Sequence, residues 1–156
     1  MKTKTFRTAS WRQTMALAEK MALNLRPGDC LALVGDLGSG KTTFVKGLAQ
    51  GLGFKKKAYV CSPTFVILKI YPSRIPLYHF DVYRLASHDD FLRAGLDEFL
   101  QTEGISVVEW ADKVENALPA GYTRVEFDFA GKSGRSIRVR TAGSRDLFGK
   151  PRVKKP

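Results

Sequence analysis

A short glycine-rich stretch between two apolar runs holds the residues that could bind a phosphate group. Gly35 and the triplet Gly40-Lys41-Thr42 match the pattern G-x-x-x-x-G-K-[ST]. In such a loop, backbone N–H groups surround phosphate oxygens, the lysine reaches the β and γ phosphates, and the threonine hydroxyl can ligate Mg²⁺. The alternative is an ordinary glycine-rich turn, which the apolar strand pattern before the loop and the helical pattern after it disfavour. The match predicts a nucleotide site formed by Asp36, Leu37, Gly38, Ser39, Gly40, Lys41, Thr42 and Thr43.

A loop of this kind needs an acidic partner for the metal, and two carboxylates stand at the ends of apolar strand patterns. Glu109 follows the apolar run 105–108, and Asp81 follows the run 77–80. The carboxyl ends of neighbouring strands meet at one edge of a sheet, beside such a loop. We expect one carboxylate to hold Mg²⁺, directly or through water, and the other to orient an attacking water. The alternative for either residue is a solvated surface carboxylate.

Two aromatic neighbours of these carboxylates are candidates for further roles. Trp110 follows Glu109, where a large ring can cover the site or meet a partner, and burial in the core is an equal alternative. His79 lies in an alternating strand pattern, which favours a core or supporting residue over a general base. Cys30 and Cys61 lack C-x-x-C spacing, so we expect two free, buried thiols in a reducing compartment.

Strand and helix patterns alternate along the chain, as in the α/β class. Apolar residues at helical spacing predict a helix over 11–25, capped by Ser10, and another from Lys41 to the stop at Gly53. Apolar and alternating runs predict the strands, with one hairpin formed by 64–71 and 75–83 and another around a turn at 131–134. The other expected elements are strands over 4–9, 30–35, 64–71, 75–83, 105–110 and within 124–140, and helices over 88–95, 96–103 and 111–118.

Length and charge limit the organisation of the chain. Its 156 residues, 44% hydrophobic, suit one compact domain, which we place at 1–143. The net charge is +11, with basic ends that could attract phosphate-bearing partners such as RNA, while 81–128 is acidic. Residues 144–156 are basic and poor in apolar side chains, so we expect a flexible tail. The chain has no apolar stretch of membrane-spanning length and no signal-peptide pattern, which predicts a cytoplasmic protein with no membrane partner.

Several separate motifs together resemble one known family. The stretches "GDLGSGKTTFVKGL", "SPTF", "HFDVYRL", "GLDEFL" and "VVEWADKVENALP" occur in an order and spacing similar to those of the TsaE (also called YjeE) family of bacterial ATPases. The resemblance covers roughly residues 5–140. It implies a single P-loop NTPase-like domain with a mixed, mostly parallel sheet flanked by helices. It also implies ATP and Mg²⁺ as cofactors, and a role in making threonylcarbamoyladenosine in tRNA with the partners TsaD and TsaB, through which tRNA would be met indirectly.

The resemblance also implies roles for individual residues. Lys41 and Thr42 would hold phosphate and Mg²⁺, Glu109 would be the metal carboxylate, and Asp81 would be a catalytic carboxylate. The residues with a switch-like or nucleotide-contacting role would be Ser62, Thr64, Trp11 and Gly134. The chain departs from the family pattern at Ala111, where a proline often follows the E-W pair, and in the segment after about residue 143, to which the resemblance assigns no role.

Two other functional classes remain open from the sequence. A small-molecule P-loop kinase is the main alternative, but it usually needs an arginine-bearing lid, whereas "RSIRVR" alternates like a strand. A pure RNA-binding module would explain the basic ends but not the combination of Lys41, Thr42 and Glu109. For an ATPase without a visible lid or second substrate pocket, we expect low activity alone and stimulation by partners.

Overall fold

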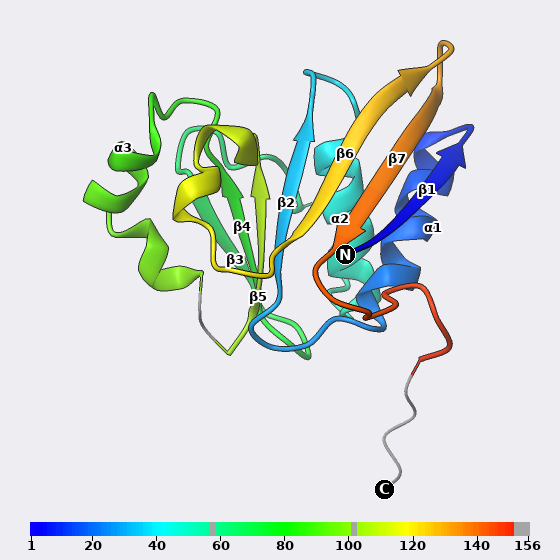
Figure 1. Ribbon diagram of the computed structural model, residues 1–156, viewed down its shortest axis with the longest axis horizontal. Coiled ribbons are helices and arrows are strands. Elements are labelled where there is room, and N and C mark those ends of the chain that lie inside the picture. Colours follow the sequence, from blue (N-terminus) through cyan, green and yellow to red (C-terminus); the bar gives the residue numbers. More distant parts are fainter. Residues whose placement is uncertain (57–58, 101–102, 152–156) are drawn as a thin grey trace, which may run out of the picture.

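The computed structural model describes residues 1–56, 59–100 and 103–151. Strands alternate with helices and short 3-10 turns along the described chain (Figure 1). The elements are β1 (Lys2–Thr8), α1 (Trp11–Ala22), β2 (Cys30–Gly35), α2 (Lys41–Gly51), β3 (Leu68–Tyr71), β4 (Leu77–Asp81), α3 (His88–Arg93), η2 (Leu96–Phe99), β5 (Ile105–Glu109), η3 (Ala111–Lys113), η4 (Glu115–Ala117), β6 (Thr123–Ala130) and β7 (Gly134–Thr141).

The strands form one mixed, seven-stranded sheet in the order β1-β7-β6-β2-β5-β4-β3. Its centre is parallel, because β2 pairs in parallel with β6 and β5, and β5 pairs in parallel with β4. Both edges are antiparallel, with β3 running against β4 and β7 running against β6 and β1. The predicted α/β class and the mixed sheet with flanking helices are therefore confirmed.

The strand register brings the two candidate carboxylates together. Glu109, at the end of β5, is paired with Asp81 at the end of β4 and with Leu33 in β2. The chain leaves β2 at Gly35 and enters the glycine loop just beyond this level. The loop and both carboxylates thus lie at the carboxyl edge of the parallel strands, where open α/β sheets bind their ligands.

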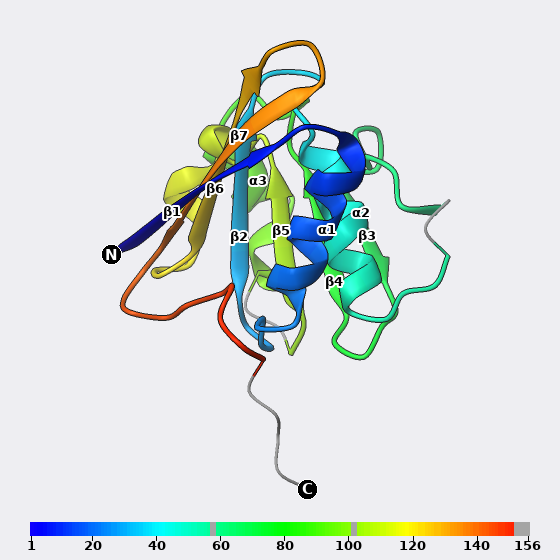
Figure 2. The same cartoon turned by 90° about the vertical axis from the view of Figure 1, so that its right-hand side faces the viewer.

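Helices cover the two faces of the sheet and enclose two apolar cores. α1 and α2 lie side by side against one face (Figure 2), where Phe44 and Leu48 are fully buried. Their close approach depends on Gly47, because a Cβ atom there would lie 2.3 Å from the Met15 carbonyl oxygen. On the other face, α3 and the 3-10 turns form the second core around the fully buried Phe91.

The β3–β4 hairpin is present but shorter than predicted. The strand expected over 64–71 begins only at Leu68. Ile67 has a φ of +68°, which ends an extended strand because the left-handed region turns the chain. The residues before it form a separate loop that carries the "SPTF" motif, so the correction concerns a segment next to the candidate site.

Three predicted helices differ from the structure by more than their last two residues. The helix expected over 11–25 ends at Ala22, because the amides that follow bond three residues back rather than four and so tighten the turn. The helix expected over 111–118 is two 3-10 turns separated by a residue with non-helical dihedral angles. The helix expected over 96–103 is only a 3-10 turn over Leu96–Phe99. Residues 101–102 of that expected helix lie outside the described residues.

The segment after residue 143 differs from the expected loose tail in its described part. Leu147 is 2% exposed and belongs to the main core. The Phe148 ring lies 4.4 Å from the Phe6 ring, measured between centroids, and Asp146 forms an ion pair with a β1 lysine. The segment therefore packs against β1 through specific contacts. Residues 152–156 of the expected tail lie outside the described residues.

Both cysteines are free thiols, as expected, but only Cys30 is buried, since Cys61 is exposed. Burial raises the pKa of the Cys30 thiol to about 12. Within the described residues, no helix is both long and apolar enough to cross a membrane.

Candidate functional site

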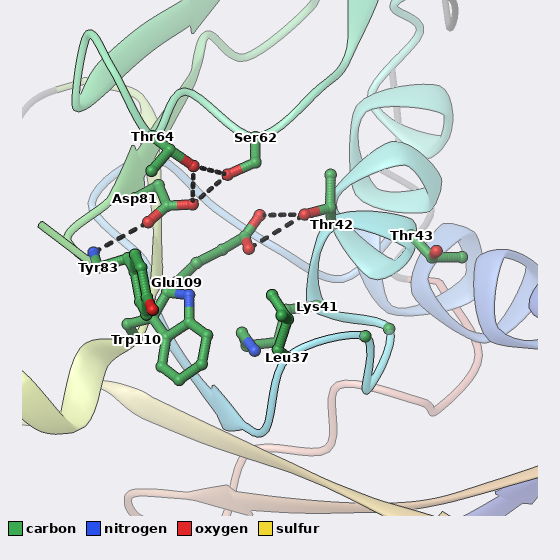
Figure 3. Close-up of a pocket in the computed structure, with 12 residues that line it drawn as sticks. Leu37, Lys41, Thr42, Thr43, Ser62, Thr64, Asp81, Tyr83, Glu109 and Trp110 are labelled. Atoms are coloured by element: carbon green, nitrogen blue, oxygen red, sulfur yellow. Dashed lines mark hydrogen bonds between the residues drawn. The ribbon is translucent and has the colours of Figure 1, made fainter.

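The glycine loop between β2 and α2 surrounds the side chain of its own lysine (Figure 3). Gly38 and Gly40 have φ angles of +74° and +106°, in the left-handed region that glycine adopts without a steric cost. The Lys41 Nζ donates hydrogen bonds to the carbonyl oxygens of Gly35 at 2.6 Å and Asp36 at 3.0 Å. Loop carbonyls and the first turn of α2 therefore hold one ammonium group at the edge of the sheet.

The surroundings of Lys41 shift its pKa and place an aromatic ring against its ammonium group. Burial lowers the pKa of Lys41, and the nearby carboxylates of Glu109, Asp81 and Asp36 oppose that shift. The Lys41 Nζ also lies 3.9 Å from the centroid of the Trp110 ring, within cation–π range. Trp110 has a left-handed φ of +60°, which turns the chain immediately after β5. The indole thus covers the lysine from the β5 side.

Glu109 connects the loop to the interior of the sheet. This residue is 2% exposed, and both of its carboxylate oxygens accept from the Thr42 hydroxyl, at 2.9 and 3.1 Å. The His79 Nε2 lies 2.7 Å from Oε1 of the same carboxylate. A buried carboxylate is stable only with such donors or with a nearby cation, and Glu109 has both.

Asp81 is held by the loop that precedes β3. It is 2% exposed, and its Oδ2 accepts hydrogen bonds from the hydroxyls of Ser62 and Thr64, the latter at 3.0 Å. The other oxygen, Oδ1, accepts from the backbone N–H of Tyr83 at 3.0 Å. Figure 3 shows Asp81 with these partners on one side of the site and Glu109 with Thr42 on the other. The "SPTF" segment is therefore in direct contact with a candidate catalytic group.

These side chains line one cavity of about 400 Å³. The lining includes loop residues, both carboxylates and the residues expected to act as a switch or to contact a partner. The lining consists of Leu37, Gly38, Gly40, Lys41, Thr42, Thr43, Ser62, Thr64, Asp81, Tyr83, Glu109 and Trp110. The structure thus gathers residues from four separate segments around one space.

Four predicted nucleotide contacts lie outside that lining. Asp36 contacts the site through its carbonyl group, and Ser39 is fully buried, with an Oγ that has no hydrogen-bond partner among the described residues. Gly134 begins β7, and the following Arg135 donates to the Ser39 carbonyl oxygen at 2.9 Å. Trp11, the first residue of α1, is 57% exposed. The late hairpin thus contacts the loop, whereas Trp11 faces solvent.

Comparison with known proteins identifies the family. The family model described as "Threonylcarbamoyl adenosine biosynthesis protein TsaE" matches residues 8–137. The chain belongs to the TsaE family. It is 43% identical over 146 residues to the tRNA threonylcarbamoyladenosine biosynthesis protein TsaE of Bacillus subtilis, covering 93% of this chain and 90% of the relative.

Other relatives of the TsaE family agree in sequence and fold. The Treponema pallidum protein with the same description is 42% identical over 123 residues, covering 79% of this chain and 82% of its own. The crystal structure of Bacillus subtilis YdiB superimposes with a TM-score of 0.75 and 39% identity, covering 91% of this chain and 87% of that one. The fold described above is therefore shared with a solved relative.

Three residues of this TsaE-family site were not predicted from the sequence. Tyr83 lines the cavity and supports Asp81, Arg135 holds the glycine loop, and Tyr71 contacts His79. Tyr83 lies within "HFDVYRL", so its motif was a signal for it. Arg135 contacts loop residues far away in sequence, and Tyr71 contacts a histidine on the neighbouring strand, so no local pattern predicts either contact.

The donor set at the loop is suited to a hard divalent cation. Thr42 offers a hydroxyl oxygen and Glu109 a carboxylate, the oxygen ligands that Mg²⁺ prefers. Among the described residues no group of three or more His, Cys, Asp or Glu is placed to hold a metal.

Proposed function

We propose that this TsaE-family chain binds and hydrolyses ATP in tRNA threonylcarbamoyladenosine biosynthesis. Family membership assigns the chain to that biosynthesis. The proposal of an ATPase is supported above all by one observation, the convergence of Lys41, Thr42, Glu109 and Asp81 on a single cavity. An ammonium, a hydroxyl and two carboxylates beside a glycine loop are the groups that phosphoryl transfer requires.

Each group has a defined task in the proposed reaction. The Lys41 ammonium binds the β and γ phosphates, together with backbone N–H groups at the start of α2. Thr42 and Glu109 would hold Mg²⁺, which when bound neutralises charge on the phosphates. Asp81 orients the attacking water, since its carboxylate is fixed by the loop at Ser62.

The mouth of the cavity is suited to a protein partner, which we propose to be TsaD with TsaB. Apolar side chains in the lining, or next to it along the chain, are exposed: Leu37 and Phe65 by 80% each, and Val66 by 68%. Tyr83 is 50% exposed and packs against Trp110, with ring centroids 4.9 Å apart. Exposed aromatic and aliphatic groups beside a site are typical anchors of an interface. In this proposal tRNA is met indirectly, through the partners.

A small-molecule kinase receives less support. The segment "RSIRVR", which could have supplied the arginines of a lid, lies within β7 and pairs with β6 and β1. Among the described residues, the arginine of this strand nearest the loop, Arg135, donates to loop carbonyls. A phosphate-transfer assay over candidate acceptors separates this function from hydrolysis.

The decisive experiment measures ATP turnover with and without added TsaD and TsaB. We expect weak turnover by the chain alone and a marked rise with both partners, because contact at the mouth orders Asp81, Glu109 and Trp110 around the nucleotide. Trp110→Ala should reduce this stimulation more than it reduces ATP affinity. Leu92→Ala, which removes a 44% exposed apolar side chain on α3, is the matched control and should respond as wild type does. Equal rates with and without partners would contradict the partner assignment, and absence of turnover in every mixture would contradict the ATPase itself.

A further inference from the structure

His79 is a fully buried polar residue inside the sheet, directly behind Glu109. It lies in β4, where the register places it between Lys69 of β3 and Val107 of β5. Its Nε2 is 2.7 Å from Glu109 Oε1. An ionised carboxylate can only accept hydrogen bonds, so Nε2 is the donor in this contact. The imidazole therefore holds the oxygen that also accepts from Thr42.

The other ring nitrogen of His79, Nδ1, contacts residues that lie farther from the site. His79 Nδ1 lies 3.2 Å from the hydroxyl of Tyr71, and that hydroxyl lies 3.3 Å from the Cys61 carbonyl oxygen. Burial raises the pKa of Tyr71 to about 12, so the hydroxyl keeps its single proton at physiological pH and donates it either to His79 Nδ1 or to the Cys61 carbonyl oxygen, one at a time. Tyr71 is 1% exposed, and its ring packs on Phe54, with centroids 5.3 Å apart. The imidazole ring is thus fixed from both sides.

The backbone at Cys61 leads directly to the second carboxylate. Cys61 is followed by Ser62, whose hydroxyl donates to Asp81. Asp81 in turn ends β4, the strand that carries His79. Side-chain hydrogen bonds and the β3–β4 hairpin therefore connect the supports of Glu109 and Asp81 in one network.

We propose that His79 is a positioning residue, which fixes the Glu109 carboxylate beside Thr42 for Mg²⁺, and that Tyr71 fixes His79. This inference rests on the proposed function, because it gives His79 a task only if Glu109 serves the metal. A partner that orients a ligating group is commonly worth 10–100-fold in metal affinity or activity. The alternative is a buried histidine whose hydrogen bonds merely satisfy its own polar atoms.

Two amide substitutions separate these alternatives. The side-chain nitrogen of glutamine can take the place of His79 Nε2 and still donate to Glu109, while that of asparagine reaches only the place of Nδ1. Both variants replace a buried ring by a smaller amide, so each loses ring packing against Tyr71. Melting without ligand reports that shared loss of stability.

The measurement is the Mg²⁺ concentration that gives half of the nucleotide-dependent rise in Tm, followed by ATP turnover against Mg²⁺. We expect His79→Asn to raise the Mg²⁺ concentration required by about tenfold or more, and His79→Gln to stay well below that factor. Saturating Mg²⁺ should restore most of the turnover of His79→Asn, because the carboxylate itself is intact. Tyr71→Phe, which keeps the ring and removes only the hydroxyl, should shift the requirement in the same direction by a smaller factor.

Each of the remaining outcomes would contradict a stated part of the proposal. An equal Mg²⁺ requirement for His79→Asn and His79→Gln would overturn the positioning role while leaving the proposed function intact. Wild type without any Mg²⁺-dependent nucleotide stabilisation would overturn the proposed function and this inference with it. If His79→Asn does not fold, Tyr71→Phe decides, since an unchanged Mg²⁺ requirement in that variant refutes the network.

Discussion

Removing the ammonium of Lys41 should abolish the stabilisation that we expect Mg²⁺ and ATP to give to the fold. In the structure this group is within hydrogen-bonding distance of two loop carbonyl oxygens and is surrounded by the carboxylates of Glu109, Asp81 and Asp36. In Lys41→Ala the acidic groups remain and their nearest cation is lost. A polyphosphate then approaches like charges without the group that offsets them, so its affinity falls steeply.

The size of the effect follows from linkage and from the length of the chain. At a hundredfold excess of ligand over its dissociation constant, binding stabilises the folded state by about 2.7 kcal/mol. Unfolding entropy near Tm is about 2.1 cal/mol/K per residue, or about 0.33 kcal/mol/K for a chain of 156 residues. The expected rise in Tm for wild type is therefore about 8 °C.

A thermal-shift titration with ATP and with GTP, both with Mg²⁺, measures this directly. Wild type should show the full rise with ATP and much less with GTP, and Lys41→Ala should show almost none. Lys46→Ala, in the same helix and outside the lining of the cavity, is the matched control and should respond as wild type does. A full rise in Lys41→Ala, or an equal response to the two nucleotides, would refute the site as assigned.

Three further predictions concern the carboxylates and the packed C-terminal segment. Asp81→Ala should bind nucleotide but lose turnover, whereas Glu109→Ala should also lose its Mg²⁺ dependence. ATPase assays across a Mg²⁺ series measure both effects. Wild-type activity in both variants would contradict the assignment. Leu147→Ala should lower the free energy of unfolding by about 2–3 kcal/mol in urea titrations, because the side chain is buried in the core; an unchanged midpoint would show that the segment does not pack as described. The hydrogen bond from Lys4 lowers the pKa of Asp146 to about 2 from 3.8, so this group stabilises the fold above pH 3.8 and loses that effect as pH falls towards 2. Wild type should therefore be more stable than Asp146→Asn at pH 6 and no more stable at pH 2, as judged by urea midpoints at the two values.

The glycine loop and its two carboxylates could be located from the sequence because their signals are local. The loop motif spans only Gly35 to Thr42, and the apolar runs before Asp81 and Glu109 mark buried strands directly. Parallel pairing then places strand ends at a common edge without further information. The structure has this arrangement, since Asp81 and Glu109 are paired across β4 and β5.

The path of the chain beside the site could not be predicted in the same way. Ile67 adopts a left-handed φ, which β-branched residues rarely do, so no propensity places a turn there. The conformation is held by tertiary contacts, because the Ile67 carbonyl oxygen accepts from the Asp81 N–H at 2.8 Å and its own N–H donates to Pro63. Such conformations concentrate at functional sites, where the surrounding structure determines them. Trp110, also left-handed, lines the cavity itself.

The C-terminal segment shows a second limit of local patterns. Few residues after 143 are apolar, but Leu147 and Phe148 are among them. These two side chains need only a matching apolar surface to pack against. β1 supplies that place through Phe6, which lies far away in sequence. Arg145 adds an ion pair with Asp29 at 2.7 Å. Composition measures how much a segment can bury, and it does not reveal whether a distant strand offers the matching surface.

The polar groups of the candidate site already have partners within the chain, and this determines what kind of ligand can bind. Lys41 donates to two loop carbonyls, Thr42 donates to Glu109, and Asp81 accepts from Ser62 and Thr64. A neutral ligand would only exchange one set of hydrogen bonds for another, with little net gain. A polyphosphate with Mg²⁺ offers charge to both sides at once, the anion to Lys41 and the cation to Thr42 and Glu109. Nucleotide should therefore bind more tightly with the metal than without it, because a polyphosphate alone would approach the carboxylates of Glu109 and Asp81 without the cation that offsets them.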